Sequence, residues 1–211
     1  MNPLTSELSL PGWDESYTKE QLRGLLAQYE EIGEEKLWNN LQTFLEAVIP
    51  VAEESGINMA IHPDDPPWGL FGLPRIITCE ENLDRFLKLV DSPANGLTFC
   101  TGSLGASPDN DLVKMAKKYA QRIHFAHLRN VLWTGEKQFH EVGHPTCCGS
   151  IDLYGIVRSL VEGGFDGYVR PDHGRMIWGE TGRYGYGLYD RALGATYLTG
   201  LFEAVEKTLA K

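Results

Sequence analysis

The sequence has few cysteines, few basic residues and no long hydrophobic run. Four cysteines occur among 211 residues, at positions 79, 100, 147 and 148, and no two of them have the CxxC spacing. The small number of cysteines, the absence of this spacing and the length of the chain argue against a fold that depends on disulfide bonds. We therefore expect a reducing, cytoplasmic compartment. No stretch reaches about 18 apolar residues, so we expect no transmembrane helix. Met1 to Glu20 lacks the basic and apolar regions of a secretory signal, so we expect none there.

Positive charge is scarce relative to negative charge. Lysine and arginine number 19 and aspartate and glutamate number 29, which gives a net charge of −10. Nucleic-acid binding and attraction to an anionic membrane both need clustered positive charge, so we expect neither. The excess of negative charge is concentrated in residues 1–60, which have a net charge of −8, whereas residues 61–211 have a net charge of −2. A small anionic substrate is therefore compatible with the second region.

Short apolar runs alternate with helical patterns after residue 57, and this alternation is typical of parallel βα units. Strands are predicted at about 58–62, 96–100, 123–128 and 167–172. Helices are predicted at about 80–91, 109–120, 151–163 and 188–209. Residues 1–57 form a helical lead-in, with helices at about 18–30 and 34–55, and Thr18 and Gln21 fit a capping box.

The loops that leave the predicted strands are long, and those that enter them are short. In a (β/α)8 barrel the long loops lie at the carboxyl ends of the strands, where active sites are built. A complete barrel needs eight units and about 250 residues. We therefore expect one α/β domain over residues 1–211, with residues 58–211 as four βα units of a barrel. A small open α/β sheet is the alternative.

Each predicted strand ends at or near a residue of a type that binds metal ions. These residues are His62, Cys100, His127 and Asp172. Because strand ends converge in a barrel, side chains distant in sequence can meet there. Two imidazoles, a thiolate and a carboxylate suit a divalent transition ion better than Mg²⁺ or Ca²⁺. Taken singly, each residue also has an ordinary structural interpretation, such as a hydrogen-bonded histidine or a buried apolar cysteine.

Two further residues are candidates for substrate binding. Arg129 follows His127 by two residues, so it points to the same side of the strand, where it could hold a substrate carboxylate. Asp64 follows the first strand, and we expect it near the substrate. Alternatively, Asp64 and Asp65 orient ligand imidazoles or form a turn. Residues 173–187 contain five glycines, which suits a mobile lid or a long surface loop.

Several stretches resemble the mannonate dehydratases of hexuronate catabolism. They are IHPDDPPWGLFGLPRI at 61–76, NGLTFCTGSLG at 95–105, NDLVKMAKKYAQRIHFAHLRN at 110–130, FHEVGH at 139–144, GSIDLYGIVRSLVEGGFDGYVRPDHG at 149–174 and GYGLYDRALGATYLTGL at 185–201. An upstream stretch, LPGWDESYTKEQLRGLLAQYEEI at 10–32, is also similar. The HPDDPP, CTGS and RPDHG motifs together make this resemblance specific.

The resemblance implies a (β/α)8 TIM barrel of the xylose-isomerase-like group, of which this chain holds the last four units. It also implies a lyase that dehydrates D-mannonate to 2-keto-3-deoxy-D-gluconate. The family's Mn²⁺-type site, for which Fe²⁺ and Co²⁺ are alternatives, falls on the four residues already selected at the strand ends. Its acid–base residues fall on His173 and Tyr186, with Tyr184 as a competitor of the latter. Either His173 or Tyr186 could act as the base.

Other functions remain open at this stage. A metal-dependent sugar isomerase of the same fold group is the first alternative, although such sites are usually richer in carboxylates. An inactive half-barrel that binds a metal ion or a partner is the second. Four parallel strands leave two open edges, which invite association, so a homo-oligomer or completion by a missing half is also expected.

Overall fold

The computed structural model describes residues 18–210, so the first 17 residues of the predicted lead-in lie outside the described residues. Four parallel strands form the main sheet in the order β1-β2-β3-β6. They are β1 (Met59–Ile61), β2 (Asn95–Cys100), β3 (Ile123–His127) and β6 (Tyr168–Arg170). This order confirms the predicted run of parallel βα units. Among the described strands, β1 and β6 each have one neighbour, so the sheet has two open edges.

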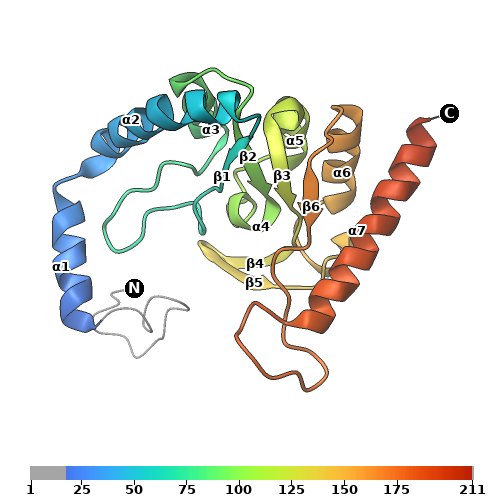
Figure 1. Ribbon diagram of the computed structural model, residues 1–211. Coiled ribbons are helices and arrows are strands. Elements are labelled where there is room, and N and C mark those ends of the chain that lie inside the picture. Colours follow the sequence, from blue (N-terminus) through green and yellow to red (C-terminus); the bar gives the residue numbers. More distant parts are fainter. Residues whose placement is uncertain (1–17, 211) are drawn as a thin grey trace.

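Helices cover one face of this sheet, along its convex side (Figure 1). They are α2 (Gly33–Glu54), α3 (Glu80–Leu89), α5 (Leu112–Tyr119), α6 (Leu153–Glu162) and α7 (Leu188–Leu209). Asp111 and Asp152 cap α5 and α6, because each carboxylate accepts a hydrogen bond from a backbone N–H of the first turn. The core lies between these helices and the sheet, and its most buried large side chains include Phe86, Leu97, Phe99, Met115, Leu153 and Ile156.

The two helices predicted before the first strand begin and end within one residue of the predicted positions. Helix α1 (Lys19–Glu30) begins with the predicted capping box, in which the Thr18 and Gln21 side chains each accept a hydrogen bond from the other residue's backbone N–H. Helix α2 continues through Pro50. Gly56 follows the end of α2 with a φ of +65°, a left-handed conformation that glycine adopts at low cost. In Figure 1, α1 extends away from the sheet.

The structure differs from the sequence prediction at three places. Strand β6 ends at Arg170 rather than at residue 172, because Pro171 has no N–H and Asp172 has a φ of +60°. The loop predicted at 128–150 contains an antiparallel hairpin of β4 (Val131–Gly135) and β5 (Gln138–Glu141). The loop predicted at 101–108 begins with a short helix, α4 (Thr101–Leu104).

No helix in the stretch from residue 18 to residue 210 is both long and apolar enough to cross a membrane.

Candidate metal centre and acid–base site

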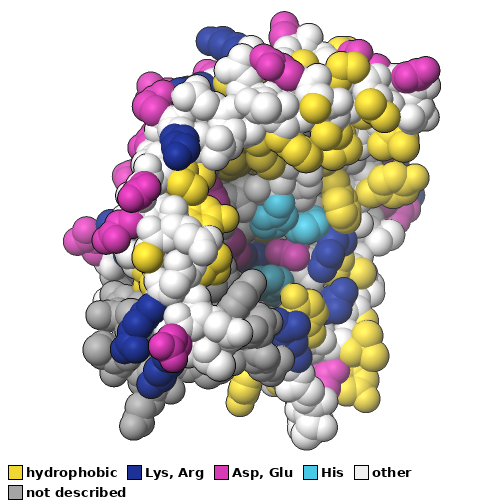
Figure 2. All heavy atoms as spheres, turned by 60° about the vertical axis from the view of Figure 1, so that its left-hand side comes forward, with side chains coloured by type: hydrophobic (Ala, Val, Ile, Leu, Met, Phe, Trp, Pro, Cys, Tyr) yellow, Lys and Arg dark blue, Asp and Glu magenta, His cyan; other side chains and the backbone are white. Residues whose placement is uncertain are grey.

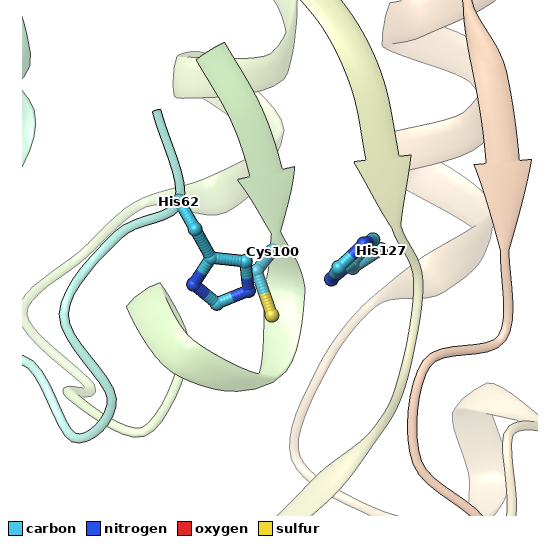
Figure 3. Close-up of side chains that lie close together, drawn as sticks. All are labelled: His62, Cys100 and His127. Atoms are coloured by element: carbon cyan, nitrogen blue, oxygen red, sulfur yellow. The ribbon is translucent and has the colours of Figure 1, made fainter. Parts of the chain in front are cut away.

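Three predicted ligands meet at the carboxyl end of the sheet. His62 follows β1, Cys100 ends β2 and His127 ends β3, with Cys100 and His127 paired in register. One ligand atom from each of the three residues lies within 4.8 Å of the others. Figure 3 shows the three side chains pointing toward one another from neighbouring strand ends. In the space-filling view, histidine and acidic side chains gather inside a hollow of the molecule, with basic side chains beside them (Figure 2).

The fourth predicted ligand, Asp172, joins this cluster from the end of β6. Its Oδ2 lies 3.6 Å from Cys100 Sγ, and its Oδ1 lies 3.4 Å from His127 Nδ1. Its left-handed backbone conformation is uncommon outside glycine and turns the carboxylate out of the strand direction. Nε2 of His144, a buried residue, lies 2.8 Å from the carbonyl oxygen of Pro171 and holds this turn in place. Asp172 thus lies against Cys100 and His127, whereas the ligand atoms that are all within 4.8 Å of one another belong to His62, Cys100 and His127.

The protonation state of His127 suits metal binding. Burial lowers the pKa of His127 to about 4, and the charge of Asp172 opposes this only partly. The imidazole is therefore neutral at pH 7. Both of its ring nitrogens are buried, and neither has a hydrogen-bond partner among the described residues. A buried, neutral imidazole without partners is costly unless something binds it, so this side chain fits a metal ligand.

His62 and Cys100 are compatible with the same role. His62 Nδ1 lies 2.7 Å from the carbonyl oxygen of Pro63, and this hydrogen bond leaves Nε2 available as a ligand. Burial raises the pKa of the Cys100 thiol to about 11, against the opposing charge of Arg129. A bound divalent cation favours the thiolate and so offsets that cost. Ser103 Oγ, 3.0 Å from the Cys100 sulfur, orients it.

Arg129 is placed differently from the prediction that it holds a substrate carboxylate. Its guanidinium is buried, and each nitrogen faces a carboxylate of the protein itself. Nε lies 2.8 Å from Asp172, Nη1 lies 2.5 Å from Glu141 and Nη2 lies 2.5 Å from Asp65. No N–H edge of this guanidinium faces outward for a substrate. Arg129 does point to the same side as His127, and there it binds the candidate ligand Asp172.

The Asp64 carboxylate also binds groups of the protein itself. Its Oδ2 accepts hydrogen bonds from the backbone N–H groups of Ile76 and Ile77, at 3.0 and 2.9 Å. These bonds close the long loop after β1 onto itself. The geometry therefore supports the turn-forming interpretation of Asp64 over the predicted substrate contact, and its neighbour Asp65 is the one that reaches Arg129.

Of the two predicted acid–base residues, His173 lies next to Asp172, and Tyr186, which is about half exposed, lies beside His173. The ring centroids of His173 and Tyr186 are 6.2 Å apart. Backbone hydrogen bonds of Gly174 with Gly185 and Gly187 hold the lid segment beside His173. His173 Nε2 lies 3.9 Å from Asp172 Oδ2. Tyr184, the competitor of Tyr186, is 82% exposed.

Sequence reasoning missed Glu141 as part of the site, and it assigned to Asp65 a contact with ligand imidazoles rather than the observed one with Arg129. Glu141 Oε1 lies 3.0 Å from His173 Nδ1 as well as near Arg129. Burial alone would raise the pKa of Glu141, but the hydrogen bond from His173 and the charge of Arg129 hold it below its usual range. The only signal for Glu141 was its position in the FHEVGH stretch, because the hairpin that carries it was not predicted.

Comparison with known proteins identifies the family. The family model described as D-mannonate dehydratase (UxuA) matches residues 3–211. A mannonate dehydratase of Streptococcus agalactiae serotype Ia is 56% identical over 209 residues, which cover 98% of this chain and 60% of that protein. The crystal structure of mannonate dehydratase from Streptococcus suis serotype 2 matches with a TM-score of 0.85 and 50% identity, over 90% of this chain and 55% of that one.

A more distant match supports the fold alone. A xylose isomerase domain protein from Planctomyces limnophilus matches with a TM-score of 0.57 and 14% identity, over 82% of this chain and 55% of that one. The fold is thus of the xylose-isomerase-like barrel type, with four strands of the barrel present in the described residues. The chain spans about 60% of the length of the curated relatives it matches. It belongs to the D-mannonate dehydratase (UxuA) family.

Proposed function

We propose that this chain carries the metal centre and the acid–base pair of an enzyme that dehydrates D-mannonate to 2-keto-3-deoxy-D-gluconate. The observation that carries the proposal is the convergence of His62, Cys100 and His127. Asp172 lies against Cys100 and His127, and His173 lies between Asp172 and Tyr186. The chain spans about 60% of its relatives. The activity is therefore proposed for the chain together with the remaining part of the barrel.

The four clustered side chains would hold one divalent ion, for which we propose Mn²⁺, with Fe²⁺ or Co²⁺ as alternatives. Mixed nitrogen, sulfur and oxygen ligands suit transition ions of this kind. The buried, unpartnered imidazole of His127 supports the assignment, because it lacks any other hydrogen-bond partner among the described residues. When bound, such an ion supplies Lewis-acid stabilisation of the negative charge that develops next to the substrate carboxylate.

His173 and Tyr186 would move the protons of the reaction. One of them removes the proton from C2, and the electron pair of that C–H bond forms the C2–C3 double bond. The C3–oxygen bond breaks, and the other residue donates a proton to the departing hydroxyl, which leaves as water. The resulting enol becomes the 2-keto product by transfer of a proton to C3. The hollow in which histidine, acidic and basic side chains gather (Figure 2) supports a small polar molecule such as a sugar acid as the substrate.

The test is an assay of D-mannonate dehydration with Mn²⁺. The chain is purified alone, and also together with the part of the Streptococcus agalactiae enzyme that it does not cover. We expect turnover only in the combined form, because the described sheet has two open edges and an incomplete wall. His173→Gln should abolish turnover. A combined form that is well folded but inactive on D-mannonate would overturn the proposal, and isomerisation of a neutral sugar instead would favour the sugar isomerase.

A further inference from the structure

Glu141 is the last residue of β5, at the base of the β4–β5 hairpin. One of its carboxylate oxygens, Oε1, lies 3.0 Å from His173 Nδ1 and 2.5 Å from Arg129 Nη1. We infer that Glu141 is a positioning residue, which keeps a proton on Nδ1 of His173 and thereby turns Nε2 toward the metal ligands. This inference deepens the proposed function and rests on it, since it assigns a partner to one of the two proposed acid–base residues.

The position of the proton follows from the chemistry of the pair. An ionised carboxylate can only accept hydrogen bonds. Arg129 and His173 together favour the ionised form of Glu141, as described above. Nδ1 must therefore be the donor in this contact. In a histidine, the hydrogen bond at one ring nitrogen sets which nitrogen carries the proton, so a single ring proton held on Nδ1 leaves Nε2 as the acceptor.

The orientation of the ring follows from its second nitrogen. Nε2 lies 3.9 Å from Asp172 Oδ2, on the side of the ring that faces the ligand cluster. Nδ1 faces away from the cluster, toward the hairpin. A free nitrogen directed at the cluster is what proton exchange with a bound substrate requires. Without Glu141, the ring could rotate or carry its proton on Nε2.

Strand pairing in the β4–β5 hairpin and an ion pair fix the position of Glu141 beside His173. Glu141 pairs with Val131 in the β4–β5 register, and the N–H of Val142 donates to the carbonyl of Asn130. Arg129 binds Glu141 and Asp172 through different nitrogens of one buried guanidinium. Glu141, the partner of His173, and Asp172, a proposed metal ligand, thus bind to the same planar guanidinium group of Arg129. The hairpin, which leaves the sheet at Arg129, has a defined role in the site.

Two substitutions separate this role from a merely structural one. Glu141→Leu removes the acceptor, whereas Glu141→Gln keeps a carbonyl oxygen that can accept from Nδ1. Glu136→Gln, at the exposed tip of the same hairpin, is the matched control. The first measurement is ¹⁵N NMR of the histidine-labelled chain in the combined form described above, in which the His173 signals are identified by their loss in His173→Gln. We expect the Nδ1–H tautomer in the parent, in Glu141→Gln and in Glu136→Gln, and its loss in Glu141→Leu.

The second measurement is steady-state kinetics on D-mannonate with Mn²⁺. We expect Glu141→Leu to lower kcat at least about tenfold with little change in KM, Glu141→Gln to recover most of the loss, and Glu136→Gln to match the parent. An Nε2–H tautomer in the parent, or an unchanged tautomer in Glu141→Leu, would overturn the inference. Equal losses in Glu141→Leu and Glu141→Gln, with a raised KM, would also overturn it. Absence of all activity with the expected tautomer would instead refute the proposed function and leave the positioning of His173 standing.

Discussion

Arg129 Nε lies 2.8 Å from Asp172 Oδ2, and both side chains are almost completely buried. Asp65 and Glu141 occupy the other two nitrogens of the same guanidinium. One buried cation thus faces three carboxylates, which leaves an excess of negative charge beside the ligand cluster. An added divalent cation would offset that excess, so the electrostatics of the chain itself favour a positive ion at this place.

Replacing Arg129 by methionine should destabilise the fold strongly. The variant would leave buried Asp172 with only the more distant Arg170, 3.5 Å away, as a cationic partner. Removing one partner of a buried ion pair typically costs about 3–5 kcal/mol. Urea unfolding of the ion-free chain measures this. Arg158→Met is the control, because the Arg158–Glu162 pair lies exposed on α6 and its loss should cost less than about 1 kcal/mol. Similar losses of unfolding free energy in both variants would show that the buried ion pairs of Arg129 stabilise the fold no more than an exposed pair does.

The ion-free chain should lose stability between about pH 6.5 and pH 4 because of His127. Burial lowers the pKa of His127 from its usual value of 6.5 to about 4 in the folded state. The unfolded state then binds more protons across this window, so the free energy of unfolding falls as the pH falls through it. The shift corresponds to at most about 3 kcal/mol. His127→Gln should flatten the dependence of unfolding on pH there, and an unchanged slope would show that His127 titrates normally.

Gly102 should tolerate no side chain. A Cβ at this position would lie 2.3 Å from Arg129 Cζ, and both residues are buried. Gly102→Ala must therefore displace the guanidinium from its three carboxylates, and overpacking of this kind costs about 1–3 kcal/mol. Gly200→Ala, in α7, is the control, since a Cβ there meets nothing within 4 Å and alanine should stabilise the helix by about 0.5–1 kcal/mol. Thermal unfolding of both variants distinguishes the two effects.

The alternation of short apolar runs and helical patterns was enough to predict the four parallel strands and to place His62, Cys100 and His127 at neighbouring strand ends. It was not enough to predict the partners of Arg129. The two-residue spacing from His127 correctly indicates its side of the sheet, but Asp65 reaches it from a loop 64 residues away in the sequence and Glu141 reaches it from strand β5 of the hairpin. The sequence gives no strand signal for the hairpin that carries Glu141, because its strands are short and mostly exposed and so lack the buried apolar run of β2.

The same limit applies to Asp64 and Asp65. Adjacent carboxylates in one motif look equivalent in the sequence, yet Asp64 accepts from Ile76 and Ile77 whereas Asp65 binds Arg129. Successive residues of a turn point in different directions, and only the path of the loop decides which one faces the site. Burial and charge around each carboxylate are properties of the assembled fold rather than of the motif.

Cys100 should be the one cysteine whose sulfur binds the ion. It lies buried against Asp172, whereas Cys147 and Cys148 are exposed in a short turn of 3-10 helix and Cys79 lies at the start of α3. Titration with Co²⁺ tests this, because a cobalt–thiolate bond gives a near-ultraviolet charge-transfer absorption that nitrogen and oxygen ligands do not give. We expect this band in the parent chain and its loss in Cys100→Ser. The Cys147→Ser, Cys148→Ser double variant and Cys79→Ser should keep the band, since none of the three sulfurs belongs to the cluster that His62 and His127 form with Cys100. A band that survives in Cys100→Ser and disappears in the double variant would place the ion near Thr146–Cys148 instead, and the strand-end site would then be wrong.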